Sequence, residues 1–161
     1  MVERASSTMT LTLPSDQEIV LTRVFDAPRE LVWKACTDPE AIPRWWGPRR
    51  HTTRVDKMDV RPGGAWRFVS RDAGGNEFAF HGEYREVVPP ERIVQTFEFE
   101  GMPGHVSVET MTLVEHQGKT TLTTRSVFDS VEDRDGMLQS GMEAGVRETY
   151  DRLAEYLETL K

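Results

Sequence analysis

The sequence predicts an α+β fold, in which an antiparallel sheet of about seven strands is covered on one face by a long C-terminal helix. Apolar residues alternate with a period of two over most of the region from His51 to Phe128, and short breaks rich in Gly and Pro interrupt it. The stretch from about Val131 to Leu160 has helical periodicity instead. Connections this short join antiparallel neighbours, because parallel strands need long crossovers.

The length of 161 residues fits a single domain that can bury its own core. Lys and Arg together number 20 and Asp and Glu 27, which gives a formal net charge of −7. This acidity disfavours binding to nucleic acid and to anionic membranes, because both attract basic surfaces. The chain has no apolar run long enough to span a membrane and no signal-peptide region, and its single Cys36 rules out a disulfide framework. We therefore expect a cytoplasmic protein without integral membrane association.

The N-terminal part of the chain is predicted to differ from the rest. Residues 1–16 are rich in Ser and Thr and form a flexible arm, with a short edge strand suggested at Thr10–Leu13. Residues 17–161 form one domain, which begins with a strand at Glu18–Phe25, where apolar residues alternate.

Two short helices follow the first strand. Asp26-Ala27-Pro28 ends the strand, and a helix is predicted for Arg29–Cys36 because proline suits the first helical turn. A second helix begins with Asp38 as its N-cap and Pro39 as its first residue, and it ends at Trp45-Trp46-Gly47-Pro48. The two tryptophans form a plug in the core, or one of them forms the rim of a cavity entrance.

Turn-forming residues divide the central region into six further strands. They are predicted at Thr52–Val60, Ala65–Arg71, Glu77–Val87, Arg92–Glu100, Ser107–Glu115 and Thr120–Phe128. Alternation gathers aromatic side chains on one face of these strands, and Thr124 adds a hydroxyl group there. We predict that a cavity between this face and the helix is lined by Trp46, Trp66, Phe68, Phe80, Tyr84, Phe97, Phe99, Met111, Thr124, Met137, Gly141, Met142 and Gly145.

Two glycines interrupt the long helix, for which Ser130 is the predicted N-cap. Gly141 and Gly145 stand four residues apart, although a glycine inside a helix costs about 1 kcal/mol relative to alanine. They either let the helix pack closely on the sheet or leave room for a cavity, around which Met137 and Met142 adapt to an apolar guest. The predicted inner stripe of this helix also contains Leu138, Thr149, Leu153, Tyr156 and Leu160.

The sequence contains no phosphate-binding glycine loop and no nucleophile elbow, so we assign no catalytic residue. Its four histidines are scattered, which indicates no metal site, and no cofactor is expected. His81 is predicted to lie opposite the aromatic face, exposed or paired with a glutamate. A bulge near Gly82 would instead turn it inward to form a proton-transfer pair with Tyr84. Cys36 is predicted to be an inert buried thiol.

Several motifs, in the same order, make the chain resemble a known superfamily. They are FDAPRELVWKACTDPE (Phe25–Glu40), RWWGP (Arg44–Pro48), DVRPGGAWRF (Asp59–Phe68), GEYREVVPPERIV (Gly82–Val94) and GMEAGVRETYDRLAEYL (Gly141–Leu157). From Glu18 to Leu160 the chain resembles the SRPBCC, or START-like, superfamily, within it the bacterial group similar to the C-terminal domain of the activator of heat-shock protein 90 ATPase. The resemblance implies a helix-grip fold, in which a curved antiparallel sheet wraps the C-terminal helix around a hydrophobic cavity.

Members of that superfamily include lipid and sterol carriers, polyketide cyclases, hormone receptors and chaperone activators, so the fold alone does not decide the function. The first hypothesis is that the chain binds or carries a small hydrophobic molecule, without covalent chemistry. The second is a cyclase- or aromatase-like enzyme that uses polar cavity residues, and the third is a stress- or chaperone-linked interaction domain. An exposed sheet edge or an apolar rim would also support a homodimer.

Overall fold

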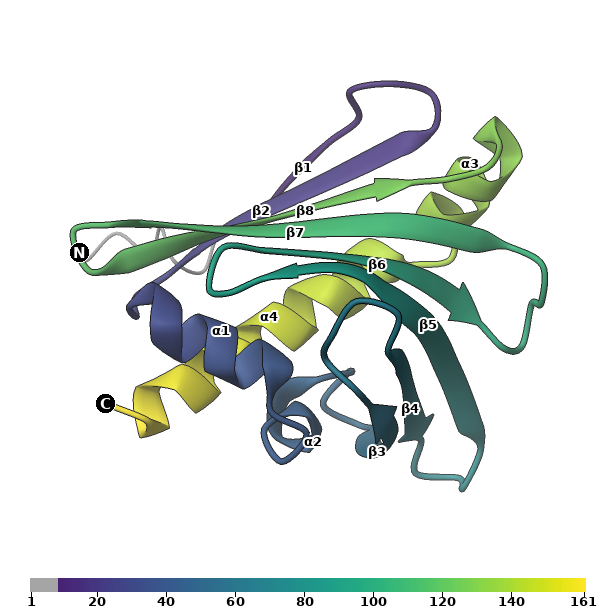
Figure 1. The fold of residues 1–161 in the computed structure, drawn as a ribbon. Coiled ribbons are helices and arrows are strands. Elements are labelled where there is room, and N and C mark those ends of the chain that lie inside the picture. The colour runs from purple at the N-terminus through teal and green to yellow at the C-terminus, as the bar shows by residue number, and fades with distance from the viewer. Residues whose placement is uncertain (1–8) are drawn as a thin grey trace.

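Eight antiparallel strands form one curved sheet in the computed structural model, which describes residues 9–161 (Figure 1). Across the sheet their order is β1-β2-β8-β7-β6-β5-β4-β3. The strands are β1 (Met9–Thr12), β2 (Glu18–Phe25), β3 (Thr52–Met58), β4 (Ala65–Arg71), β5 (Glu77–Val88), β6 (Arg92–Phe99), β7 (Val106–His116) and β8 (Lys119–Val127). The strand at the start of the domain therefore pairs with the last strand, and β3–β8 form a continuous meander.

The described part of the chain has one strand more than the seven predicted for the domain. It is β1, close to the short edge strand suggested at Thr10–Leu13, and it pairs with β2. Met9 at its start is buried, so this part of the predicted arm contributes to the core. Residues 1–8 of that arm lie outside the described residues.

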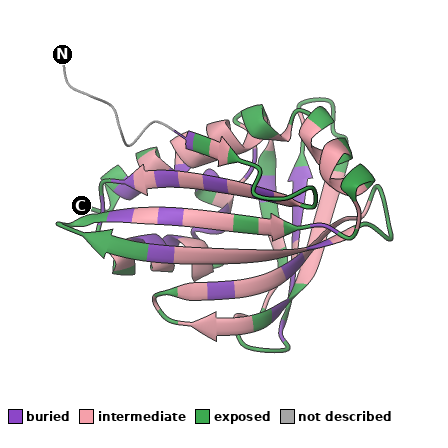
Figure 2. Ribbon diagram, turned by 90° about the horizontal axis from the view of Figure 1, so that it is seen from above, coloured by how far each residue is buried: buried purple, intermediate pink, exposed green. Residues whose placement is uncertain are grey.

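Side chains alternate between the two faces of the sheet as the sequence predicts. In β2 every second residue is buried, beginning with Ile19 and ending with Phe25, and the intervening residues are half-buried. Figure 2 shows this alternation along several strands. The concave face of the sheet holds the core, because α1 (Arg29–Thr37), α2 (Ile42–Trp45) and α4 (Met142–Thr159) lie on that side (Figure 1).

The second short helix begins later than predicted. Asp38 does not cap it: its carboxylate accepts a hydrogen bond from the backbone N–H of Glu40 at 2.9 Å, in a turn that precedes α2. The helix itself starts at Ile42, after Ala41 as N-cap. The Asp side chain forms a local turn with its own backbone, which competes with helix capping for the same group.

The single long C-terminal helix predicted from Val131 to Leu160 is wrong. The chain forms two helices there, α3 (Val131–Gln139) and α4, with Ser130 capping the first as predicted: its Oγ accepts from the Asp133 N–H at 3.1 Å. Gly141 separates them with a left-handed backbone, φ +84°. Only glycine adopts this conformation without a steric penalty, so this residue ends one helical path and begins another.

The second half of α4 packs on the larger core cluster. Leu153 and Leu157 are buried, and Tyr150 packs edge-on against Phe25 with ring centroids 5.9 Å apart. Leu160, predicted to lie on the inner stripe, is 37% exposed. Leu160 is the C-cap of α4, just beyond the last helical residue Thr159, so it lies at the frayed end of the helix rather than over the sheet.

Two clusters of buried residues form the core on the concave side. The larger lies between the sheet, α1, α2 and the second half of α4, and it includes Phe25, Trp45, Trp66 and Leu153. The smaller lies between the β1–β2–β8 edge of the sheet and the first half of α4. Its buried members are Met9, Ile19, Leu21 and Phe128, with Met137, Met142 and Tyr150 among the partly buried residues packed on them.

Candidate functional site

Six aromatic side chains meet on the concave face of β4, β5 and β6, and we call them the aromatic cluster. They are Trp46, Trp66, Phe68, Phe80, Phe97 and Phe99. Ring centroids of neighbouring members are 4.9–6.0 Å apart, within the range of favourable aromatic pairs. Trp66 and Phe68 are buried, whereas Phe80, Phe97 and Phe99 remain half-buried. The cluster therefore has a sealed side and an accessible side.

The close approach of Trp66 to the sheet depends on Gly82. Trp66 stands opposite Gly82 in the β4–β5 register, and its Nε1 donates to the backbone oxygen of Thr96 at 3.2 Å. A Cβ at Gly82 would lie 2.6 Å from that nitrogen and 1.9 Å from the Thr96 oxygen. The absence of a side chain at Gly82 thus lets the indole lie flat across β5 and reach β6.

Beside the aromatic cluster, polar side chains form a row across the middle of the concave face. Gln95 on β6, Glu109 on β7 and Ser126 on β8 are direct cross-strand neighbours. Gln95 Nε2 donates to Glu109 Oε1 at 3.3 Å, and the Ser126 hydroxyl also bonds to this carboxylate. We call these three residues the polar row.

Glu109 is the titratable group of this row. Burial raises the pKa of its carboxyl to about 7, although the hydrogen bonds from Gln95 and Ser126 act in the opposite direction. The residue nevertheless retains some accessible surface, so it is surrounded by protein without being sealed off. Within residues 9–161, no ion pair involves Glu109. Burial therefore moves the titration of this carboxyl from the acidic range towards neutral pH.

A tyrosine from α4 lies over the same region. The Tyr150 hydroxyl is 3.2 Å from the Thr124 Oγ1 on β8, and burial holds the pKa of this tyrosine well above its usual range. The charge of Glu109 raises it further. Thr124 stands opposite Met111. Met111 is two residues from Glu109 on β7, so the two side chains lie on the same face of the sheet. The concave face thus combines aromatic rings, a carboxyl group and hydroxyl groups.

The structure brings most of the predicted lining residues together on this face. Tyr84 is buried on β5 opposite Gln95, and Met111 lies opposite Ile93 and Thr124. Trp45 is a core plug, as one prediction had it: its Nε1 donates to the Ala35 oxygen at 3.0 Å. Trp46 joins the aromatic cluster, and its place at the rim of a cavity entrance stays a prediction.

The predicted lining residues of the C-terminal helix lie elsewhere. Met137 and Met142 pack on the smaller core cluster, next to β1, β2 and β8. Gly141 is exposed in the α3–α4 turn, and a Cβ at either Gly141 or Gly145 would meet no atom within 4 Å. These glycines therefore do not pack closely on the sheet, which was one of the two alternatives.

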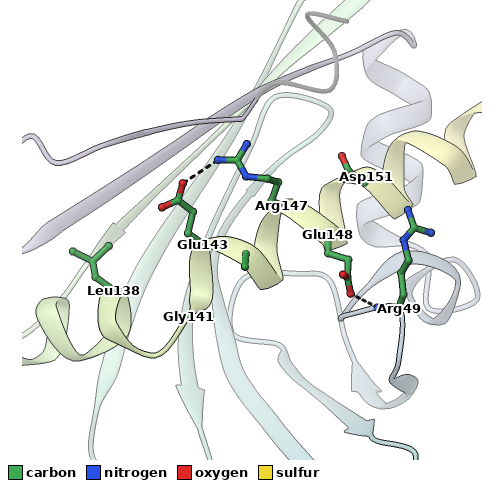
Figure 3. Close-up of a pocket in the computed structure, with 8 residues that line it drawn as sticks. Arg49, Leu138, Gly141, Glu143, Arg147, Glu148 and Asp151 are labelled. Carbon is green, nitrogen blue, oxygen red and sulfur yellow. Dashed lines mark hydrogen bonds and ion pairs between the residues drawn. The ribbon is translucent and has the colours of Figure 1, made fainter.

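A concavity of about 600 Å³ lies beside the first half of α4 (Figure 3). Its lining is mainly charged: Glu143 pairs with Arg147 at 2.9 Å, and Glu148 accepts a hydrogen bond from the Arg49 N–H at 2.6 Å. Figure 3 shows both contacts along α4, with Gly141 at one end of the helix. Charged groups that already pair with one another offer little to an apolar ligand.

Of the histidines, His51 lies at the edge of the concave face, where its Nδ1 is 2.7 Å from the Ser70 hydroxyl and its ring stacks on Phe78 with centroids 5.6 Å apart. His81 points to the opposite face of β5, where its ring nitrogens are 3.2 Å from Glu98 and 2.9 Å from Glu100, so its predicted pairing with glutamate is confirmed. The alternative, a proton-transfer pair with Tyr84, is wrong: the β-bulge lies between Tyr84 and Glu86, beyond Gly82, and leaves the alternation of His81 unchanged.

Sequence reasoning missed three residues of this site: Gln95, Glu109 and Tyr150. The alternation that puts Met111 in the predicted lining also places Glu109 inward, because the two residues are two positions apart on one strand. A glutamate at an inward position of an otherwise apolar strand was thus the signal. Tyr150 had a similar signal, because it stands three and seven residues before the apolar Leu153 and Leu157, on one face of a helix.

Comparison with known proteins shows one matching family and several similar structures. Residues 26–158 match the family described as “Activator of Hsp90 ATPase homolog 1-like protein”. No curated protein matches the chain. A protein from Rhodobacter sphaeroides has a TM-score of 0.89 and 24% identity, over 94% of this chain and 99% of that chain.

Two further solved structures resemble the chain at somewhat higher identity. A protein from Chromobacterium violaceum is 30% identical over 88% of this chain and 98% of its own, with a TM-score of 0.78. DynU16, described as a protein in the dynemicin biosynthetic locus, is 28% identical over 92% of this chain and 49% of its own, with a TM-score of 0.70. The predicted α+β helix-grip fold is confirmed.

Proposed function

The chain belongs to the family of activator of Hsp90 ATPase homolog 1-like proteins, and from this premise we propose that it binds a small hydrophobic molecule without covalent chemistry. The ligand, lipid-like or aromatic and polyketide-like, would lie between the concave face of the sheet and α4. The fold is shared by proteins of several functions, so the proposal depends on the side chains of this face.

The half-buried aromatic rings carry the proposal. Phe80, Phe97 and Phe99 point to the concave side, yet each keeps accessible surface. Complete burial of a phenylalanine side chain stabilises a protein by about 1.5–3 kcal/mol relative to leaving it exposed. Three adjacent rings that obtain only part of this stabilisation in the free protein would obtain the remainder under an apolar guest.

The polar row supports the proposal in a second way. Ligand sites combine mostly apolar walls with a few polar groups that orient the guest. Gln95, Glu109 and Ser126 supply such groups next to the aromatic cluster, and Thr124 with Tyr150 adds two hydroxyl groups.

Thermal unfolding in the presence of aromatic and lipid-like compounds tests the proposal. A ligand at a hundredfold excess over its dissociation constant stabilises the protein by about 2.7 kcal/mol, and the melting temperature rises accordingly. Trp46 and Trp66 belong to the aromatic cluster, so the same ligand should change the tryptophan fluorescence.

A matched pair of variants locates the binding. Phe99→Leu, on the accessible side of the aromatic cluster, should weaken binding of the same compound. Val114→Ala, at a position of β7 that is 62% exposed, should leave binding unchanged. If no apolar compound raises the melting temperature, or if both variants bind as the parent does, the proposal is wrong.

A cyclase- or aromatase-like enzyme is the second candidate. One observation favours it: the carboxyl of Glu109 titrates near neutral pH, as a general acid or base must, and it lies beside the aromatic cluster. The similar structure DynU16 is that of a protein in a biosynthetic locus. Turnover of a bound compound that Glu109→Gln abolishes, while binding persists, would favour the enzyme.

The predicted chaperone-linked role, the homodimer and the cytoplasmic location remain predictions. None of the helices in residues 9–161 is both long and apolar enough to cross a membrane. Exposed large apolar residues in that range include Met102, Val114 and Val127, on different elements of the fold. Pull-down with a purified heat-shock protein 90 and sedimentation of the chain alone would test the first two.

A further inference from the structure

Glu109 lies at the centre of the concave face, with protein on every side along the sheet. On its own strand, Ser107 and Met111 are the next residues of that face, and its cross-strand neighbours are Gln95 and Ser126. Strands continue beyond both neighbours, to Tyr84 on β5 and to Ile19 on β2. A carboxyl group in the middle of an apolar sheet face is costly to ionise, because water is largely excluded.

The neighbours of Glu109 satisfy its hydrogen-bonding capacity only in part. A carboxylate has two oxygens and about four sites that accept hydrogen bonds. Gln95 donates to one oxygen at 3.3 Å, a long contact, and the Ser126 hydroxyl supplies a second bond. Both donors are neutral, and in the described part of the chain no lysine, arginine or histidine forms an ion pair with this carboxylate. What the site lacks is therefore a positive charge.

The carboxyl group and the aromatic cluster share one surface. Gln95, which bonds to Glu109, is two residues from Phe97 on β6, and Ser107, two residues from Glu109 on β7, stands directly opposite Phe97. Glu109 and Phe97 are therefore diagonal neighbours on adjacent strands. The side chains of such neighbours lie about 7–8 Å apart or less, which is within the length of one small ligand. A molecule that covers Phe97 therefore places a substituent beside Glu109.

We propose that Glu109 recognises a protonated amine on the ligand, and that the natural ligand is an apolar, ring-containing amine. This inference rests on the proposed ligand-binding function and specifies the class of ligand. An ammonium group supplies the charge and the charge-assisted hydrogen bonds that Gln95 and Ser126 cannot supply. The negative faces of the Phe rings also favour a cation near them. A ligand carboxylate would be repelled, and a ligand hydroxyl would only repeat the neutral contacts already present.

The titratable groups around Glu109 support this selectivity. Tyr150 faces it from α4, and burial keeps the pKa of Tyr150 well above its usual range. Cys36 on α1 and Tyr84 on β5 are also near this region, and burial raises the pKa of each, that of Cys36 to about 12. These three groups are neutral at pH 7. The charge of Arg23 also acts on Tyr150, and Arg23 forms an ion pair with Asp151 at 2.6 Å.

Three probes that share one ring system test the inference: 1-naphthylmethylamine, 1-naphthalenemethanol and 1-naphthoic acid, titrated at pH 8 by calorimetry and tryptophan fluorescence. We expect the amine to bind at least about tenfold more tightly than the alcohol, and the acid most weakly. Glu109→Gln should remove the preference for the amine and leave the affinity for the alcohol nearly unchanged. The preserved affinity for the alcohol also shows that the variant is folded.

Glu83→Gln is the matched control, since Glu83 is exposed on β5 next to the inward-facing Tyr84 and therefore on the other face. It should keep the preference for the amine. The affinity of the amine should also fall about tenfold per pH unit as the pH decreases below about 7 in the parent, but not in Glu109→Gln, because a proton then competes with the ligand for the carboxylate.

The outcomes separate the inference from the proposed function. If the amine and the alcohol bind equally to the parent, or if Glu109→Gln retains the preference, the inference is wrong while hydrophobic binding stands. If none of the three naphthyl probes binds, both the inference and the binding of small aromatic molecules are overturned.

Discussion

Gln95 and Glu109 stand directly opposite each other on β6 and β7, and the Gln95 amide donates to the Glu109 carboxylate at 3.3 Å on the concave side of the sheet. This pair lies between the aromatic cluster and the region under α4 that contains Thr124 and Tyr150. The centre of the concave face is thus polar, although most of its surroundings are apolar. The neutral donors around Glu109 stabilise its charged form only partly. Ionisation of Glu109 should therefore lower the free energy of unfolding by a measurable amount.

Glu109→Gln should change how stability depends on pH. Burial raises the pKa of Glu109 from 4.5 to about 7 in the folded state, so the folded protein binds this proton more tightly than the unfolded chain. The resulting stabilisation is full below about pH 4.5 and is lost as the pH rises through about 7. The loss amounts to at most on the order of 3 kcal/mol, and less where water reaches the carboxyl.

Urea unfolding of the parent and of Glu109→Gln between about pH 4.5 and pH 8 measures this effect. The difference in unfolding free energy should shift in favour of the glutamine variant as the pH rises. Glu83→Gln, on the exposed face, should follow the parent at every pH. Parallel curves for the parent and Glu109→Gln would show that Glu109 titrates alike in the folded and unfolded states.

Alanine at the two glycines near the start of α4 should have opposite effects. Gly141→Ala should destabilise the protein by about 1–2 kcal/mol, because its φ of +84° is unfavourable for any residue with a Cβ. Gly145→Ala should stabilise it by about 0.5–1 kcal/mol, since a helical alanine has less conformational entropy to lose and meets no atom within 4 Å.

Chemical denaturation of both variants checks the signs. The structure of the α3–α4 turn would be contradicted if Gly141→Ala were as stable as the parent, the result expected of one continuous helix.

Gly82→Ala should destabilise the fold through a direct clash. The new Cβ would lie 1.9 Å from the Thr96 oxygen and 2.6 Å from Trp66 Nε1, so the strand or the indole must move. A cost of about 1–3 kcal/mol is typical of overpacking. The loss of the hydrogen bond from Trp66 to Thr96 should appear as altered tryptophan fluorescence in the folded protein.

Gly136→Ala provides the comparison, since a Cβ there, on α3, would meet nothing within 4 Å. It should leave the fluorescence unchanged and should not destabilise the protein. Equal stability of Gly82→Ala and Gly136→Ala would contradict the close approach of Trp66 to β5.

Cys36 should react slowly with thiol reagents in the folded protein. Burial raises the pKa of its thiol to about 12, so at pH 8 almost none of the reactive thiolate is present. A colorimetric disulfide reagent should label it rapidly in guanidinium chloride and only slowly without denaturant. Rapid labelling of the native protein would contradict the predicted inert, buried thiol.

Local patterns of residues were enough to predict most of the sheet. The alternation that brings Trp66 and Phe68 to one face and Arg67 to the other holds in β4, and Ser130 caps α3 as expected. Strand alternation and N-capping depend on neighbours within a few positions, so a single sequence contains the necessary information. The same rule, applied to β7, would also have placed Glu109 on the concave face, but only the contacts with Gln95 and Ser126 make its chemistry visible.

The sequence by itself determined the antiparallel sheet, its aromatic face and the helices that cover it, because these follow from periodicity. Only the tertiary structure decided how the C-terminal region divides into α3 and α4. On one continuous helix, Met137 and Met142 would point about 140° apart, since each residue turns by about 100°. Both pack on the smaller core cluster because the chain changes direction at Gly141. Glycine permits either path, and packing against β1, β2 and β8 selects the one observed.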